Sequence, residues 1–140
     1  MSQQTTYRLE EQIGYLLRLA YQRHSVIFQH HTLHDLTATQ FSAVIRIHEE
    51  GSCSQNQLGR MISVDVATIK GVVDRLNKKG LINLEADPND KRRTLISLKP
   101  ETQDMMQDLR KVGESISEET LRPLSPSDRE RLIQLLVKIS

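Results

Sequence analysis

Three helix-start signatures lie close together in the middle of this 140-residue chain. In "LTATQF" and "CSQNQL", a hydroxyl residue is followed three positions later by glutamine, which pairs Thr37 with Gln40 and Ser54 with Gln57 as capping boxes. In "VDVATI", Asp65 takes the same place. Such caps satisfy helix amides that otherwise lack partners, and each typically contributes about 1 kcal/mol. The motifs therefore predict three helices that follow one another with very short connections.

Apolar residues on either side of each cap support the same interpretation, because they can pack together as a hydrophobic staple. The three pairs are Leu36 with Phe41, Cys53 with Leu58, and Val64 with Ile69. Gly80 follows two lysines and is typical of a helix end. We predict helices at about 37–50, 54–62 and 65–79.

The segment after Gly80 changes to the pattern of a β-hairpin. "LINLE" and "TLISL" are short and rich in β-branched residues, and the turn-forming residues of "ADPNDKRRTL" lie between them. Helix is predicted again from about 100 to 121, with Pro100 in the first turn, and from Ser125 to the end of the chain. One long helix over 8–31 is predicted at the other end, from apolar residues at helical spacing.

This order of elements describes a mostly α-helical winged helix-turn-helix with a small β-hairpin wing. We expect a single domain over 1–140, in which 37–99 forms the DNA-binding region. Helices at 8–34 and 100–140 carry apolar stripes that a winged helix does not cover, so we expect them to form an intertwined homodimer. Such a dimer would place two recognition helices about 34 Å apart, over a pseudo-palindromic DNA site.

Charge is concentrated in the middle of a nearly neutral chain. The formal net charge is +1, but residues 60–93 contain eight Lys or Arg against five Asp or Glu, while both flanks are slightly acidic. A local basic surface of this kind favours an anionic partner.

The third predicted helix and the hairpin tip contain the residues expected to contact DNA. Small and polar side chains of "SVDVATIKG" can reach base edges in a major groove, and a thin cationic tip can enter a minor groove. Asp90 could pair with the Arg92 guanidinium and hold it extended. The simpler alternative is a solvated helix and a solvated charged turn. The candidate DNA-binding residues are Ser54, Gln55, Ser63, Asp65, Ala67, Thr68, Lys70, Asp90, Lys91, Arg92 and Arg93.

The core "LTATQFSAVIRIHEEG…SQNQLGRMISVDVATIKGVVDRLNKKGLI" and the wing "DPNDKRRTLISL" resemble the MarR family of bacterial repressors over nearly the whole chain. "SQNQLGR" and "DVATIKGVVDRL" are similar to repressors of nicotinate and aromatic-acid catabolism. The resemblance implies a dimer on a palindromic operator, with Asp90 and Arg92 at the minor-groove position of the wing. Lys99 differs from the family, which often has a threonine cap at this place.

The resemblance also implies an effector, a small aromatic carboxylate or phenol bound between the dimerisation helices and the winged helix. A hydroxynicotinate or hydroxybenzoate would need apolar walls and one or two cations or donors. The alternative is that the arginines are solvated and Phe41 serves only as a staple. The candidate ligand-binding residues are Tyr15, Arg18, Tyr21, Arg23, His24, Gln40, Phe41, Thr68, Val72 and Arg75.

Other classes of function have weaker support. His30, His31 and His34 lie close together, but no cysteine or carboxylate pair converges with them, so we expect no zinc sensor and no cofactor. Cys53 is expected to be packed and inert rather than redox-active.

No phosphate-binding loop or catalytic triad order is present, which argues against an enzyme, and the basic wing argues against a winged helix that binds only proteins. The polar start "MSQQTTYRLEEQ" and the single cysteine favour the cytoplasm.

Overall fold

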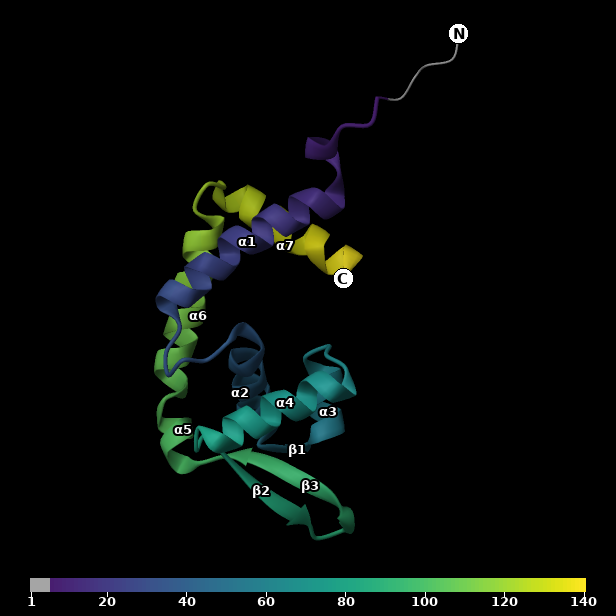
Figure 1. The fold of residues 1–140 in the computed structure, drawn as a ribbon. Coiled ribbons are helices and arrows are strands. Elements are labelled where there is room, and N and C mark those ends of the chain that lie inside the picture. The colour runs from purple at the N-terminus through teal and green to yellow at the C-terminus, as the bar shows by residue number, and fades with distance from the viewer. Residues whose placement is uncertain (1–5) are drawn as a thin grey trace. The chain divides into compact units, whose positions relative to one another are not determined.

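The computed structural model describes residues 6–140 and divides the chain into two compact units (Figure 1). One unit is formed by Thr32–Val112, and the other combines the chain up to His31 with Gly113–Ser140. The elements in chain order are η1 (Leu9–Glu11), α1 (Ile13–His31), α2 (Ala38–Glu50), β1 (Ser52–Ser54), α3 (Gln55–Met61), α4 (Val66–Lys78), β2 (Ile82–Asp87), β3 (Asp90–Leu98), α5 (Pro100–Asp104), α6 (Met106–Leu121) and α7 (Pro126–Ile139). Among the described residues, no helix is both long enough and apolar enough to span a membrane.

The three predicted helix starts are confirmed. The side chains of Thr37 and Ser54 each accept a hydrogen bond from the amide three residues later. In return, the backbone amide of each cap residue donates to the side-chain oxygen of the glutamine. The Asp65 carboxylate accepts the Thr68 amide at 2.7 Å. Each helix begins one residue after its cap, because the cap itself has extended backbone angles.

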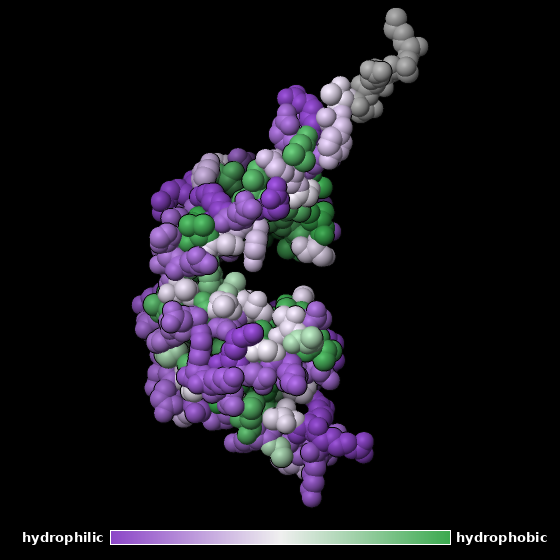
Figure 2. Space-filling view, in the orientation of Figure 1, coloured by the Kyte–Doolittle hydropathy of each residue, from purple (hydrophilic) through white to green (hydrophobic). Residues whose placement is uncertain are grey.

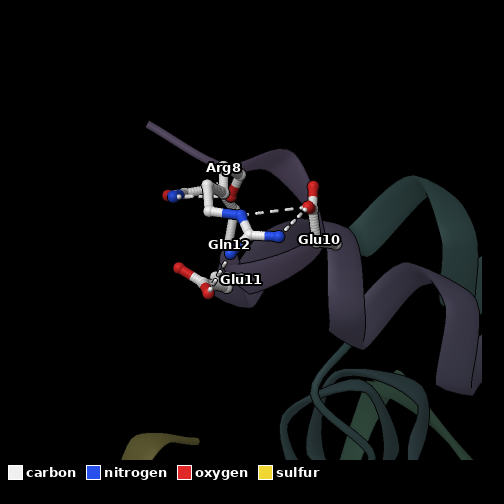
Figure 3. Close-up of polar contacts among 4 residues, drawn as sticks. All are labelled: Arg8, Glu10, Glu11 and Gln12. Atoms are coloured by element: carbon white, nitrogen blue, oxygen red, sulfur yellow. Dashed lines mark hydrogen bonds and ion pairs between the residues drawn. The ribbon is translucent and has the colours of Figure 1, made fainter. Parts of the chain in front are cut away.

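Two predicted helices are interrupted. The helix expected over 8–31 is a short η1 turn followed by α1, because Gln12 has extended backbone angles. In Figure 3, the Arg8 guanidinium pairs with Glu10 at 3.0 Å and with Glu11 at 3.6 Å, while the Gln12 side-chain amide donates to the Arg8 carbonyl. These contacts close the chain into a turn of its own before α1 begins.

The second interruption separates α5 from α6 at Met105. Its amide donates to the Thr102 carbonyl, three residues back, which tightens the helix locally. Lys99 precedes α5 and forms no side-chain cap, yet the helix still begins at Pro100. Backbone bonds from the amides of Thr102 and Gln103 to the Lys99 carbonyl, with proline in the first turn, suffice for this start.

The sheet has three antiparallel strands in the order β1-β3-β2, whereas the sequence predicted only the two-stranded hairpin. The additional strand, β1, pairs Ser52 with Ser97, Cys53 with Ile96 and Ser54 with Leu95. A three-residue strand is too short to show the alternation of polar and apolar residues by which strands are recognised. β1 therefore forms because β3 offers it an edge, not because of its own sequence.

The core of the Thr32–Val112 unit joins α2, α3, α4, the sheet and the start of α6. Its fully buried side chains include Ile47 of α2, Leu58 of α3, Leu76 of α4, Ile96 of β3 and Leu109 of α6. Polar contacts also hold this unit together. The Lys79 ammonium donates to the carbonyl of Asp35 at 2.6 Å and to Gln40 Oε1 at 3.0 Å. Lys79 thereby ties the end of α4 to the loop before α2.

In the other unit, polar contacts join α1 to the end of α6. Arg23 donates to the carbonyls of Thr120 at 2.6 Å and Glu119 at 2.9 Å, and the His24 ring bonds to Thr120 Oγ1 at 2.9 Å. His31 pairs with the Glu119 carboxylate, and this hydrogen bond lowers the pKa of Glu119. The two Arg23 bonds reach backbone carbonyls in the last turn of α6, where carbonyls lack partners within the helix.

Cys53 lies in the core, with 3% of its surface exposed. Burial, with a smaller contribution from the nearby Glu50 carboxylate, raises the pKa of its thiol to about 11. Because the thiolate is the reactive form, the native protein should react with iodoacetamide near neutral pH far more slowly than the denatured protein does. Mass spectrometry of timed samples measures both rates. Equal rates in the two states would contradict the inert role assigned to Cys53.

Candidate nucleic-acid interface

Helix α4 has one apolar face and one polar face. Ile69, Val72, Val73 and Leu76 are buried in the core, which leaves the opposite face exposed. The first residue, Val66, is exposed and apolar. The other exposed residues of the first two turns are small or cationic: Ala67, Thr68 and Lys70. This face is suited to a groove in which base edges offer acceptors and methyl groups.

The turn before α4 is set by two unusual backbone features. Ser63 is exposed and has a φ of 59°, a left-handed conformation that is uncommon outside glycine. The amide of the next residue, Val64, donates to the carbonyl of Gly59 at 2.9 Å. Asp65 follows as the cap, and the hydrogen bonds from Thr68 lower the pKa of its carboxyl. Asp65, one of the residues predicted to contact DNA, therefore already serves as the N-cap of α4.

The wing tip exposes the four predicted residues Asp90, Lys91, Arg92 and Arg93. The expected pairing of Asp90 with the Arg92 guanidinium is wrong, since no ion pair joins these two residues in the described structure. Instead, Asp90 Oδ1 accepts the backbone amide of Arg92 at 3.0 Å. This bond forms because the amide two residues ahead is within reach of a short aspartate side chain. The carboxylate thus orders the turn and leaves the guanidinium available.

A cleft of about 530 Å³ lies between α3 and the first half of β3. It brings together four residues predicted from the sequence with four that were not. The predicted ones are Ser54, Gln55, Arg92 and Arg93, and the additional ones are Asn56, Gln57, Arg60 and Thr94. The pairing of Ser54 with Leu95 in the sheet is what places α3 beside the cationic end of β3.

The lining of this cleft has the chemistry of an anion-binding surface. It contains three arginines, several amides and hydroxyls, and no acidic residue. Ser54 is buried, and its hydroxyl oxygen accepts the Gln57 amide, so Ser54 serves as the cap of α3 as well as lining the cleft. Guanidinium groups suit phosphate oxygens because several N–H donors lie in one plane.

Arg60 could have been found from the sequence. It lies four residues after Asn56 in the predicted helix, and residues at this spacing share one face. Its proximity to Arg92 and Arg93 was not accessible in this way, because it depends on the tertiary pairing of β1 with β3.

The candidate ligand-binding residues fall into both units. In the unit that contains α1, the Arg18 guanidinium lies over the Tyr15 ring at 5.5 Å, and the rings of Tyr21 and His24 are 6.3 Å apart. Arg23 and His24 already bond to the end of α6, as described above.

In the Thr32–Val112 unit, two of the candidates are buried and three are not. Gln40 belongs to the capping box and accepts from Lys79, and Val72 is part of the core. Thr68 is exposed, as is Arg75, whose guanidinium would lie 3.0 Å from a Cβ at Gly71. Phe41 is half-buried and lines an open groove of about 390 Å³ between α2 and the end of α3.

The histidines do not form a metal cluster in the described part of the chain. Within residues 6–140, no group of three or more His, Cys, Asp or Glu side chains is arranged to hold a metal ion. His31 is instead paired with Glu119.

The known proteins that are similar to this chain are transcriptional regulators. The model of the MarR family matches residues 36–94. The HTH-type transcriptional repressor NicR of Pseudomonas putida is 35% identical over 136 residues, which cover 96% of this chain and 86% of NicR.

Two solved structures are also similar. A probable transcriptional regulator from Pseudomonas aeruginosa has a TM-score of 0.92 at 44% identity, over 95% of this chain and 100% of that one. BpsR of Bordetella bronchiseptica, whose DNA binding is regulated by 6-hydroxynicotinic acid, has a TM-score of 0.89 at 35% identity, over 96% of each chain.

Replacing Arg60 by alanine should weaken binding to every duplex DNA by a similar factor, because a phosphate contact carries no sequence information. The slope of log affinity against log salt concentration should fall by about one for each cleft that contacts DNA. Fluorescence anisotropy at a series of salt concentrations measures this slope. Arg46→Ala is the matched control, since Arg46 is an exposed cation of α2 outside the cleft and pairs with Glu49. Identical slopes for the two variants would contradict the phosphate role.

Proposed function

Because this chain belongs to the MarR family of transcriptional regulators, we propose that two copies of it bind a pseudo-palindromic operator and repress transcription until a small aromatic carboxylate releases them. The observation that supports this proposal best is the cleft lined by Arg60, Arg92 and Arg93, in the same unit as the exposed polar face of α4. Its site of action would be the cytoplasm, where a bacterial operator lies.

In the proposed complex, α4 enters the major groove and the wing tip enters the adjacent minor groove. Thr68 and Lys70 face base edges, and Arg92 extends from the wing, where the negative potential of a narrow minor groove favours arginine. The cleft between α3 and the wing holds backbone phosphates. Phosphate contacts fix the register of the protein on the duplex, and base contacts select the sequence.

Exposed apolar residues support the proposed dimer. In the described residues of the unit that contains α1 and α7, the buried hydrophobic side chains are only Ile27, Phe28 and Ile116. Figure 2 shows apolar side chains on the surface of this unit. Those with at least a third of their surface exposed include Leu9, Ile13, Leu16, Leu17, Leu19, Ile133, Leu135, Leu136, Val137 and Ile139. An apolar surface of this extent is unusual for a monomer, and a second copy would cover it.

The proposed effector is a hydroxynicotinate or a hydroxybenzoate. Support comes from the likeness to NicR and to BpsR, which responds to 6-hydroxynicotinic acid. The stacked pair of Tyr15 and Arg18 offers an aromatic face and a cation, which are the two features that an aromatic carboxylate needs.

Replacing Arg92 by alanine should weaken operator binding by about 1–3 kcal/mol, because a planar cation is removed from the minor groove. Arg92→Lys is the matched control, since it keeps the charge but loses the planar fork, and it should give a smaller loss. Titrations of labelled operator measure the affinities. Because Arg92 is exposed, the melting temperature should not change. An alanine variant that binds as tightly as the parent would refute the minor-groove role.

The effector should raise the melting temperature of the protein, since a ligand that binds only the folded state stabilises it by about 2.7 kcal/mol at 100 times its Kd. The panel comprises 6-hydroxynicotinate, benzoate, hydroxybenzoates and cinnamates, with the neutral amides as matched controls. The active compound should also release the operator, and Arg18→Ala should reduce its effect. A flat response across the panel would remove the aromatic acid from the proposal while leaving DNA binding intact.

A further inference from the structure

Val66 is an apolar residue whose side chain lies outside the hydrophobic core. It is the first residue of α4, and 70% of its surface is exposed. Throughout Thr32–Val112, the only other exposed large hydrophobic residue is Leu84 on β2, at 41%. The apolar face of α4 begins at Ile69, so Val66 contributes nothing to the core. As a β-branched residue, it also adds nothing to helix propensity.

The surroundings of Val66 make the tip of α4 an apolar contact surface. Ala67 follows it in the chain and adds the methyl group of a second exposed side chain. Asp65 precedes it, but its carboxylate is turned back to the Thr68 amide at 2.7 Å and serves as the helix cap. Lys70 lies four residues further on, on the same side of the helix, and can donate to a phosphate or a base. The tip thus presents methyl groups with a cation one turn behind them.

Among the four bases, only thymine presents a methyl group in the major groove. The N-terminal residues of a recognition helix are those that approach base edges most closely. We propose that Val66 contacts the C5-methyl group of one thymine in each operator half-site and so determines the specificity for a T·A pair at that position. This inference rests on the proposed function, because it requires α4 to lie in a major groove.

The contact predicts a penalty for removing one methyl group from the DNA. A duplex is first selected from a random pool by the wild-type protein, and each thymine of one half-site is then replaced singly by deoxyuridine, which lacks only the methyl. At one position, the wild-type affinity should fall about fourfold, the equivalent of about 0.8 kcal/mol for one buried methyl group. Val66→Ala should bind the selected duplex more weakly and should show no penalty at that same position.

Two further variants make the test specific. Val66→Ile keeps an apolar side chain and should retain the penalty at the same thymine. Leu84→Ala removes the other exposed apolar side chain of this unit and should leave the whole pattern of penalties unchanged. Val66 lies outside the core, so the melting temperatures of its variants should match that of the parent and exclude misfolding as the cause.

The outcomes distinguish failure of the Val66 contact from failure of the proposed DNA binding. If the wild-type protein enriches no duplex from the pool, the proposed DNA-binding function fails. If a duplex is enriched but deoxyuridine costs nothing at any position, or if Val66→Ala shows the same penalties as the parent, only the assignment of Val66 is overturned. Loss of one penalty per half-site in Val66→Ala, with the others retained, supports it.

Discussion

The close approach of α3 and α4 at Gly59 is the contact on which the geometry of the Thr32–Val112 unit depends. A Cβ atom at Gly59 would lie 3.2 Å from Ile69 Cγ2, which is tighter than most such contacts in proteins, and 3.4 Å from the Val64 carbonyl oxygen. Glycine therefore lets the two helices pack closely, and its carbonyl accepts the Val64 amide that closes the turn between them. Because α3 lines the cleft and α4 carries the exposed polar face, this one contact sets the position of one surface relative to the other.

Most acidic residues of the basic segment 60–93 are bonded to backbone amides rather than paired with arginines. The segment 60–93 contains five Asp or Glu residues, and three of them accept backbone amides. Asp65 caps α4, Asp87 accepts the Asn89 amide at 2.8 Å, and Asp90 accepts the Arg92 amide at 3.0 Å. Each carboxylate is thus used for a helix cap or a turn, while the exposed arginines of the cleft and the wing have no acidic neighbour in the cleft lining. The number of charges alone would not have revealed this arrangement.

The two units obtain their stability differently. The Thr32–Val112 unit has a continuous apolar core, on which α4 and the β2–β3 hairpin are held. In the other unit, polar bonds from Arg23, His24 and His31 join α1 to the end of α6, while much of the apolar surface of α1 and α7 is exposed. Its packing is completed in the proposed dimer. Folding and dimerisation would then be linked in this unit, and Arg23 would support the dimer through its bonds to α6.

Most of the helical organisation was predictable from the sequence, because a cap is a local interaction. Thr37 reaches Gln40 and Ser54 reaches Gln57 within a single turn, whatever the rest of the chain does. The break at Gln12 and the strand β1 were missed, since neither has a distinctive local pattern. The sequence by itself therefore determined where α2, α3 and α4 begin and that its cations gather near a turn. Only the tertiary structure decided that Arg60 would line one cleft with Arg92 and Arg93, because the pairing of Ser54 with Leu95 joins segments about forty residues apart in the chain, and no local pattern of residues specifies such a pairing.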